Sequence, residues 1–138
     1  MTDIKPKVTA HVVPDADRST LVHRLFDLHF PMRLEPTVFN MASMLAPDYR
    51  GGFWTFYALS NGGFLMVPGG GTFEVVAENG YAGALSAQAL GITACLYAYS
   101  HLSFGEGAFA ETCAEHYHLL REFTLDHAEA RGILAAID

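Results

Sequence analysis

Residues Tyr49–Pro68 read Tyr-Arg-Gly-Gly-Phe-Trp-Thr-Phe-Tyr-Ala-Leu-Ser-Asn-Gly-Gly-Phe-Leu-Met-Val-Pro, and we expect the rest of the chain to pack around them. An aromatic run and a second apolar run flank Asn61-Gly62, a pattern that predicts a β-hairpin. Asn-Gly suits a two-residue type I′ turn, because both residues tolerate positive φ angles. Such a turn sets a register in which Leu59 faces Phe64. The other pairs predicted by this register are Ser60–Gly63, Tyr57–Met66 and Phe56–Val67.

The first predicted strand is apolar on both faces. Successive side chains of a strand point to opposite sides of the sheet, so every second residue shares a face. We therefore expect an interior strand, with helices over at least one side of the sheet. One face carries Phe53, Thr55, Tyr57 and Leu59, and the other carries Trp54, Phe56 and Ala58.

The composition predicts one packed domain, residues 1–138. Hydrophobic residues make up 51% of the chain and charged residues 17%, which argues against disorder. The formal net charge of −7 disfavours a nucleic-acid-binding protein that neutralises phosphates. The N-terminus is polar and lacks an apolar leader, and the chain has two cysteines. These features indicate the reducing cytoplasm.

Helical and strand patterns surround the hairpin. A second Asn-Gly pair, Asn79-Gly80, predicts another hairpin between strands at 72–78 and 81–85. Ser86 is a candidate N-cap for a helix that runs to Ser103. We therefore expect an α+β fold, an antiparallel three- to four-stranded β-meander packed with about four to five helices. The helices are expected at 17–29, where Pro31 ends the first, and at 37–46, 86–103, 109–127 and 129–136.

The stretch from Tyr81 to Phe104 is nearly uncharged and long enough to cross a bilayer. It begins as a strand, however, and it contains polar side chains such as Gln88 and His101. All-round apolarity also describes a helix enclosed by protein, and we expect a buried central helix without a membrane partner. Gly91 within it would permit close backbone packing.

The helix at 109–127 has two different faces at about 100° per residue. Carboxylates gather on the outward side, and residues 106–138 hold seven acids and two bases. This stripe is either a solvated face or a contact for a basic partner. It is too short for mimicry of duplex DNA, which needs two rows of charge. The outward acids are Glu111, Glu115, Glu122 and Asp126, and the inward side carries Phe109, Cys113, His116, Leu120, Phe123 and His127.

Sequence motifs for catalysis are weak. Cys113 and His116 have the spacing of two metal ligands, but zinc takes four, and no further close pair appears. Small core thiols and a hydrogen-bonded core histidine are the simpler interpretation. The glycines of 105–110 follow a helix, whereas a dinucleotide-binding loop follows a strand. We therefore predict no cofactor, no metal and no enzyme activity.

The hairpin resembles the signature of the ArdB/KlcA-type antirestriction proteins. Further matches in the same order and spacing extend the resemblance over nearly the whole chain. One departure stands near the C-terminus, where Ala128 replaces a proline of the family pattern, so that the last two helices could run on. The matching residues are Gly51-Gly52, Trp54, Phe56-Tyr57, Leu59-Ser60-Asn61-Gly62-Gly63-Phe64, Met66 and Pro68, with Val13-Pro14, Arg18, Asp48-Tyr49, Leu85-Ser86-Ala87, Gly91-Ile92, Tyr117-His118, Leu120-Arg121 and Ala136-Ile137-Asp138.

The resemblance implies a cytoplasmic protein that protects incoming plasmid or phage DNA from host restriction, mainly by type I systems. Its partner would be the restriction-modification complex or an associated host protein. We expect protein binding without catalysis, without direct nucleic-acid binding and without true DNA mimicry. The candidate contacts are the acids of the stripe and Asp138.

A small-ligand-binding protein or enzyme is the alternative. It would use a pocket near Trp54, Tyr57, Cys113 and His116. A deep pocket that holds His116 beside a second polar group would favour this alternative.

Overall fold

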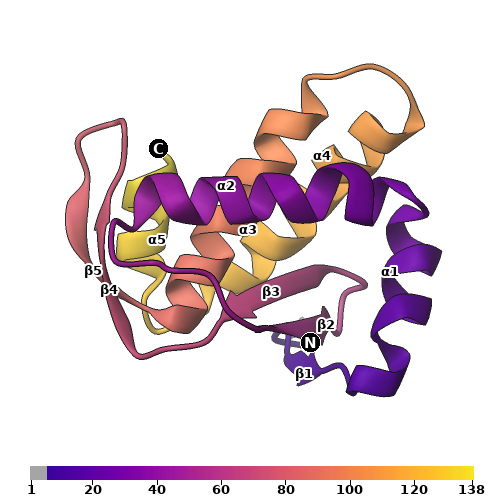
Figure 1. Cartoon of the computed structure of the whole chain (residues 1–138), viewed down its shortest axis with the longest axis horizontal. Helices are drawn as coiled ribbons and strands as arrows, with labels where there is room; N and C mark the ends of the chain where they lie inside the picture. The colour runs from indigo at the N-terminus through magenta and orange to yellow at the C-terminus, as the bar shows by residue number, and fades with distance from the viewer. Residues whose placement is uncertain (1–5) are drawn as a thin grey trace, which may run out of the picture.

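The computed structural model describes residues 6–138, which form five strands and five α-helices (Figure 1). The predicted α+β class and the number of helices are confirmed. The bounds are β1 Ala10–Val12, α1 Arg18–Phe26, α2 Glu35–Leu45, β2 Trp54–Leu59, β3 Phe64–Pro68, β4 Thr72–Val76, β5 Ala82–Ser86, α3 Ala87–Ser103, α4 Ala108–Leu125 and α5 Ala130–Ile137.

The strands form two antiparallel sheets, where we predicted one meander. β1, β2 and β3 pair in that order, and β4 pairs with β5. The outer edge of β3 is closed by α3: Tyr99 Oη donates to Phe64 O at 2.9 Å, and the Cys95 thiol lies 3.8 Å from Met66 O. Because α3 occupies this edge, β4 does not pair there. β2 is the interior strand, as predicted.

The central hairpin has a three-residue loop, and the predicted register is wrong by one residue. Ala58 pairs with Phe64, and Phe56 with Met66. Leu59 N donates to Gly63 O, and Gly62 N donates to Leu59 O. Of Asn61 and Gly62, the pair expected to have positive φ angles, only Gly62 has one, at 93°. This is a type I turn followed by a glycine in the left-handed region, the common three-residue hairpin loop.

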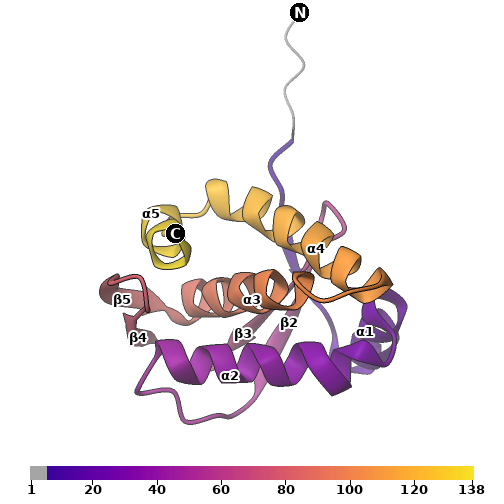
Figure 2. The same cartoon turned by 90° about the horizontal axis from the view of Figure 1, so that it is seen from above.

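Helix α3 lies at the centre of the molecule, between α2 on one side and α4 and α5 on the other (Figure 2). Its first residues follow Ser86, whose Oγ accepts the Ala89 N–H at 3.1 Å, as the predicted N-cap should. Gly91 lets this helix approach β3, since a Cβ there would lie 2.3 Å from Met66 O. No helix within residues 6–138 combines the length and apolarity needed to cross a membrane.

Two helix ends differ from the prediction. α1 ends at Phe26, where Asp27 has a φ of 55°, and Pro31 lies in the first turn of a π-helical segment, Phe30–Leu34, that leads directly into α2. Proline is compatible with a first helical turn, because the N–H it lacks has no partner there. Ala128 does not fuse the last two helices. The Glu129 N–H instead donates to His127 Nδ1 at 2.9 Å, within the turn between α4 and α5.

Candidate functional site

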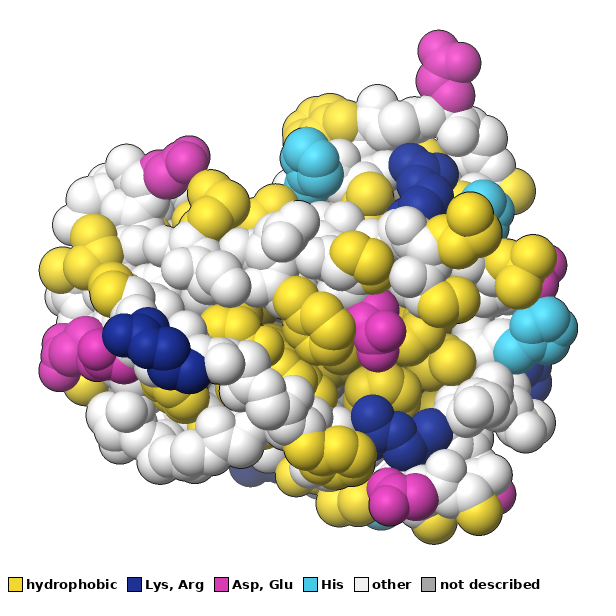
Figure 3. All heavy atoms as spheres, viewed as in Figure 1, with side chains coloured by type: hydrophobic (Ala, Val, Ile, Leu, Met, Phe, Trp, Pro, Cys, Tyr) yellow, Lys and Arg dark blue, Asp and Glu magenta, His cyan; other side chains and the backbone are white. Residues whose placement is uncertain are grey.

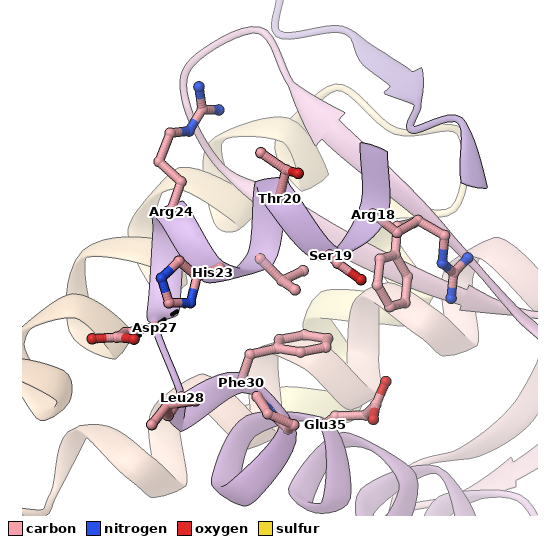
Figure 4. Close-up of a pocket in the computed structure, with 12 residues that line it drawn as sticks. Arg18, Ser19, Thr20, His23, Arg24, Asp27, Leu28, Phe30 and Glu35 are labelled. Carbon is pink, nitrogen blue, oxygen red and sulfur yellow. Dashed lines mark ion pairs between the residues drawn. The ribbon is translucent and has the colours of Figure 1, made fainter. Parts of the chain in front are cut away.

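The surface of the described chain includes two large hollows. The larger, about 1020 Å³, lies between α1 and the start of α2, and Phe56 of β2 also lines it (Figure 4). We call it the Arg18 groove, and its lining includes Arg18, Ser19, Thr20, His23, Asp27, Phe30, Glu35 and Phe56. The smaller, about 630 Å³, is the Met44 groove. It is lined by Met41, Met44, Leu45, Val76, Glu78, Tyr97, Ser100, His101 and Phe104.

Arg18 is fixed in place at one end of the Arg18 groove. Its Nη1 donates to Trp54 O at 2.7 Å. Its guanidinium carbon lies 3.5 Å from the ring centre of Phe56 and 4.7 Å from that of Phe53. Contact with an aromatic face stabilises the cation, and the hydrogen bond fixes its direction. The groove therefore offers an oriented guanidinium, a group suited to binding.

Glu35 lies across the groove from Arg18. Burial raises the pKa of its carboxyl, and the charge of Arg18 opposes that rise. At the other end, His23 Nδ1 lies 3.4 Å from Asp27 Oδ1, an exposed contact that is an ion pair only when His23 is protonated. Exposed contacts of this kind contribute little stability. Within residues 6–138, neither Ser19 nor Thr20 has a hydrogen bond to a histidine. The groove therefore shows binding groups and no activated hydroxyl nucleophile.

The pocket proposed as the alternative is not assembled. Trp54 packs on Phe39 and donates its indole N–H to Tyr49 Oη at 2.9 Å. His116 lies elsewhere in the core, with its ring centre 4.7 Å from that of Phe26 and 5.7 Å from that of Tyr99. None of Trp54, Tyr57, Cys113 and His116 lines either groove.

The buried thiols and the buried imidazole are held in their neutral forms. Burial raises the pKa of Cys95 to about 12 and that of Cys113 to about 11, so neither thiol ionises near neutral pH. Burial lowers the pKa of His116. Its Nδ1 has no hydrogen-bond partner within residues 6–138, so the expected fully hydrogen-bonded core histidine is not found. No group of three potential metal ligands comes together in this part of the chain.

The predicted acidic stripe is present on α4, with one member tied into the fold. Glu111, Glu115 and Asp126 are exposed. Glu122 is half-buried, and its Oε1 accepts from Asn61 Nδ2 at 3.1 Å, which joins α4 to the tip of the central hairpin. Asp138 is also exposed, although its backbone oxygen accepts from Asn79 Nδ2. Three side chains of the stripe are therefore open to a partner.

Two pairs of residues were not predicted from the sequence. One is Arg18 with Glu35, which only the turn between α1 and α2 brings together. The other is Ser86 with Glu129: Ser86 N donates to Glu129 Oε1 at 2.9 Å, and Ser86 Oγ donates to Glu129 Oε2. The second pair joins the start of α3 to the start of α5, so its role is structural. The sequence held one signal for this pair: Ser86 was the predicted N-cap of a helix, and a helix N-terminus favours a nearby carboxylate such as that of Glu129.

Sequence comparisons identify a protein family and relatives that match nearly the whole chain. The family model for antirestriction proteins matches residues 47–138. The antirestriction protein KlcA from Escherichia coli is 40% identical, and the match covers all of both chains. The uncharacterized protein YafX from Escherichia coli strain K12 is 38% identical, over 96% of this chain and 89% of its own length.

A solved structure agrees with these relatives. It superposes with a TM-score of 0.90 at 37% identity and covers 100% of both chains. It comes from work on the KlcA and ArdB proteins, described as showing a novel fold and antirestriction activity against Type I DNA restriction systems in vivo but not in vitro. The fold therefore defines a small α+β protein of the kind first seen in those structures. This chain belongs to the antirestriction protein family.

Proposed function

We propose that this protein protects incoming plasmid or phage DNA from type I restriction by binding a protein in the cytoplasm, without catalysis. The partner is the restriction-modification complex or a host protein associated with it. One observation supports this most strongly: the chain matches KlcA from end to end in sequence, and the KlcA/ArdB structure from end to end in fold.

Two further observations support a mechanism of binding. The thiols of Cys95 and Cys113 are protonated and buried, and His116 is enclosed by aromatic rings, so these groups are poor nucleophiles or bases. The relatives in the solved structure act in vivo but not in vitro. Such a contrast is expected of an inhibitor that requires a further cellular component.

The exposed carboxylates of α4 are our candidate for one contact with that partner. Enzymes that handle DNA carry basic surfaces that neutralise phosphates. The net charge of −7 on this protein would attract such a surface and speed the encounter. The same charge opposes direct binding to nucleic acid.

A plating assay tests the proposed function. Unmodified phage is plated on cells with a type I system, with and without this protein, and on matched cells that lack the system. We expect the protein to raise the efficiency of plating only where the restriction system is present. Equal restriction with and without the protein would overturn the proposal, and so would conversion of a substrate by the purified protein.

A charge-reversal variant tests the contact on α4. Glu111→Lys, Glu115→Lys and Asp126→Lys are combined, and Glu122 is left in place because it bonds Asn61. We expect protection to fall while the unfolding midpoint is retained. The matched control reverses three exposed acids on other elements, Asp15, Asp48 and Glu106, and should protect as the wild type does. Full protection by the folded α4 variant would remove this surface from the proposal.

A further inference from the structure

The Met44 groove lies between α2, the end of β4 and the C-terminal part of α3. Figure 3 shows the molecule hollowed at its upper edge, with hydrophobic side chains gathered on both sides of the hollow. The walls of the groove are largely apolar. Met41, Met44 and Leu45 come from α2, and they face Val76, Tyr97 and Phe104.

Several large apolar side chains in this groove are open to solvent. Met44 is 60% exposed, Val76 57% and Phe104 85%, the highest value among the exposed large hydrophobic residues of the described chain. Scattered apolar residues on a surface are ordinary, but a hollow with several of them exposed indicates a contact site. Methionine side chains suit such a site, because they are flexible and adapt to the shape of a partner.

The permanent charge at the Met44 groove is negative. Glu78 and His101 are the side chains in its lining that can carry a full charge near neutral pH, and no lysine or arginine lines it. Glu74 and Val76 point to the same exposed face of β4, so a second carboxylate lies beside the groove. The whole stretch 51–105 contains these two acids and no lysine or arginine. An apolar occupant with a positive charge would therefore meet complementary charge at the rim.

The Arg18 groove is different in this respect. Its lining carries charges of both signs, so its charge does not favour a basic partner over an acidic one. The charged residues are Arg18, Arg24, Asp27 and Glu35. The Met44 groove combines a single sign of permanent charge with exposed apolar anchors.

From this combination we infer that the Met44 groove binds a partner protein through an amphipathic segment that carries apolar side chains beside lysine or arginine. The inference rests on the proposed function, since it assigns a chemistry to the protein partner of that function. The acids of α4 would attract the basic partner over a distance, and the Met44 groove would hold its apolar side chains.

Methionine-methyl NMR provides a direct test with built-in controls. The chain has five methionines. Met41 and Met44 line the groove, whereas Met32 is 73% exposed outside it and Met66 is fully buried. The probe is a helical peptide of leucine and lysine, and its twin has glutamate at every lysine position. We expect the leucine–lysine peptide to shift the signals of Met41 and Met44, with Met32 and Met66 unchanged, and the twin to bind at least ~10-fold more weakly.

Variants separate the apolar from the electrostatic contribution. Glu78→Gln should weaken the leucine–lysine peptide roughly two- to fivefold, as expected for an exposed ion pair. Asp15→Asn, in the exposed helical turn before α1, is the matched control and should leave the affinity unchanged. Equal binding of both peptides, or equal shifts at Met32, would overturn the inference. Concentration-dependent broadening of Met41 and Met44 in the free protein would also overturn it, because a second copy would then occupy the groove.

The plating assay connects the Met44 groove to protection. Met44→Asp should reduce protection, whereas Met32→Asp, at a more exposed methionine outside the groove, should not. Full protection by a folded Met44→Asp protein would overturn the inference while the proposed function stands. If the wild type gives no protection, the proposed function fails, and the NMR result still decides whether the groove binds basic amphipathic segments.

Discussion

The two Asn-Gly hairpins begin with the same turn signal and end in different environments. All five residues of β3 are buried, whereas β4 alternates between exposed and buried residues. Asn61 at the first turn bonds to Leu119 O and Glu122 on α4. Asn79 at the second bonds to the last carbonyls of α5. The Asn-Gly pair thus specifies a reversal of the chain, and the helices around it determine whether the hairpin is buried or exposed.

The first hairpin is therefore part of the core, whereas the second contributes to the exposed surface. The β2–β3 hairpin packs on α3 and α4 and leaves little side-chain area for a partner. The β4–β5 hairpin keeps an open face, and Val76 at the end of β4 contributes to the Met44 groove. We therefore expect changes near the first hairpin to affect stability most, and changes near the second to affect local structure or recognition.

The largest expected effect is at the contact between β3 and α3. Gly91→Ala would place a Cβ 2.3 Å from Met66 O and 2.9 Å from Val67 Cα, both backbone atoms of the first hairpin. The helix or the strand must shift, at a cost of about 3 kcal/mol or more in the free energy of unfolding. Denaturant unfolding measures this. Gly71→Ala is the control and should change stability little, because a Cβ there would meet no atom within 4 Å and the φ of Gly71 is not positive.

Asn61→Ala tests the docking of the first turn on α4. It removes the bonds to Leu119 O and Glu122 and the bond from Gly63 N to Asn61 Oδ1. These bonds are partly buried, so we expect the free energy of unfolding to fall by about 1–2 kcal/mol. Thermal unfolding checks the prediction, with Asn40→Ala on the exposed side of α2 as the control. An unchanged midpoint would mean that the turn does not depend on α4.

Asn79→Ala should have a smaller and more local effect. Asn79 is exposed, and its amide bonds to Ala135 O, Ala136 O and Asp138 O near the end of α5. We expect a loss of about 1 kcal/mol or less, with faster hydrogen exchange in α5 and unchanged exchange in β2 and β3. Faster exchange in β2 and β3 as well would contradict the separation between the two hairpins.

The smallest effect concerns the pH dependence of stability. Burial among aromatic rings such as Phe26 and Tyr99 lowers the pKa of His116, so the unfolded chain takes up this proton first as the pH falls below about 6.5. The free energy of unfolding should therefore decrease with falling pH from there down to the lowered pKa. His127, whose pKa burial also lowers, adds to the same slope.

His116→Phe should flatten this dependence, whereas His118→Phe on the exposed side of α4 should leave it unchanged. Urea unfolding at several pH values between neutrality and weak acid measures the slope. An identical slope in the wild type and His116→Phe would contradict the assignment to His116.

Local patterns predicted most of the secondary structure. The N-cap at Ser86, the interior position of β2 and the close approach at Gly91 depend on neighbouring residues or on simple alternation, and all three are found. The predicted register was wrong because it depends on the hydrogen bonds of one side chain, that of Asn61. Asn61 keeps a negative φ and bonds to Gly63 N and α4, so Gly62 alone adopts the left-handed conformation. The prediction of a single meander was wrong because α3 covers the edge of β3 where β4 would have paired.

The candidate surfaces were predictable only in part. The acidic face of α4 follows from helical periodicity, and its exposed members lie where the periodicity places them. Both grooves are assembled from elements distant in sequence, such as Met44 with Phe104 and Arg18 with Glu35. No local pattern shows those pairs, because they depend on how α1 and α2 pack against the rest of the chain.

The decisive measurement for this division between core and surface is the efficiency of plating of unmodified phage, at matched protein levels, in cells with a type I system. Our claim is that the hairpin core supports the fold and an outer surface gives protection. It predicts that wild type and Asn61→Ala protect at a temperature where both are folded, and that Met44→Asp protects less. Restriction that is equally strong with and without the wild-type protein would contradict it.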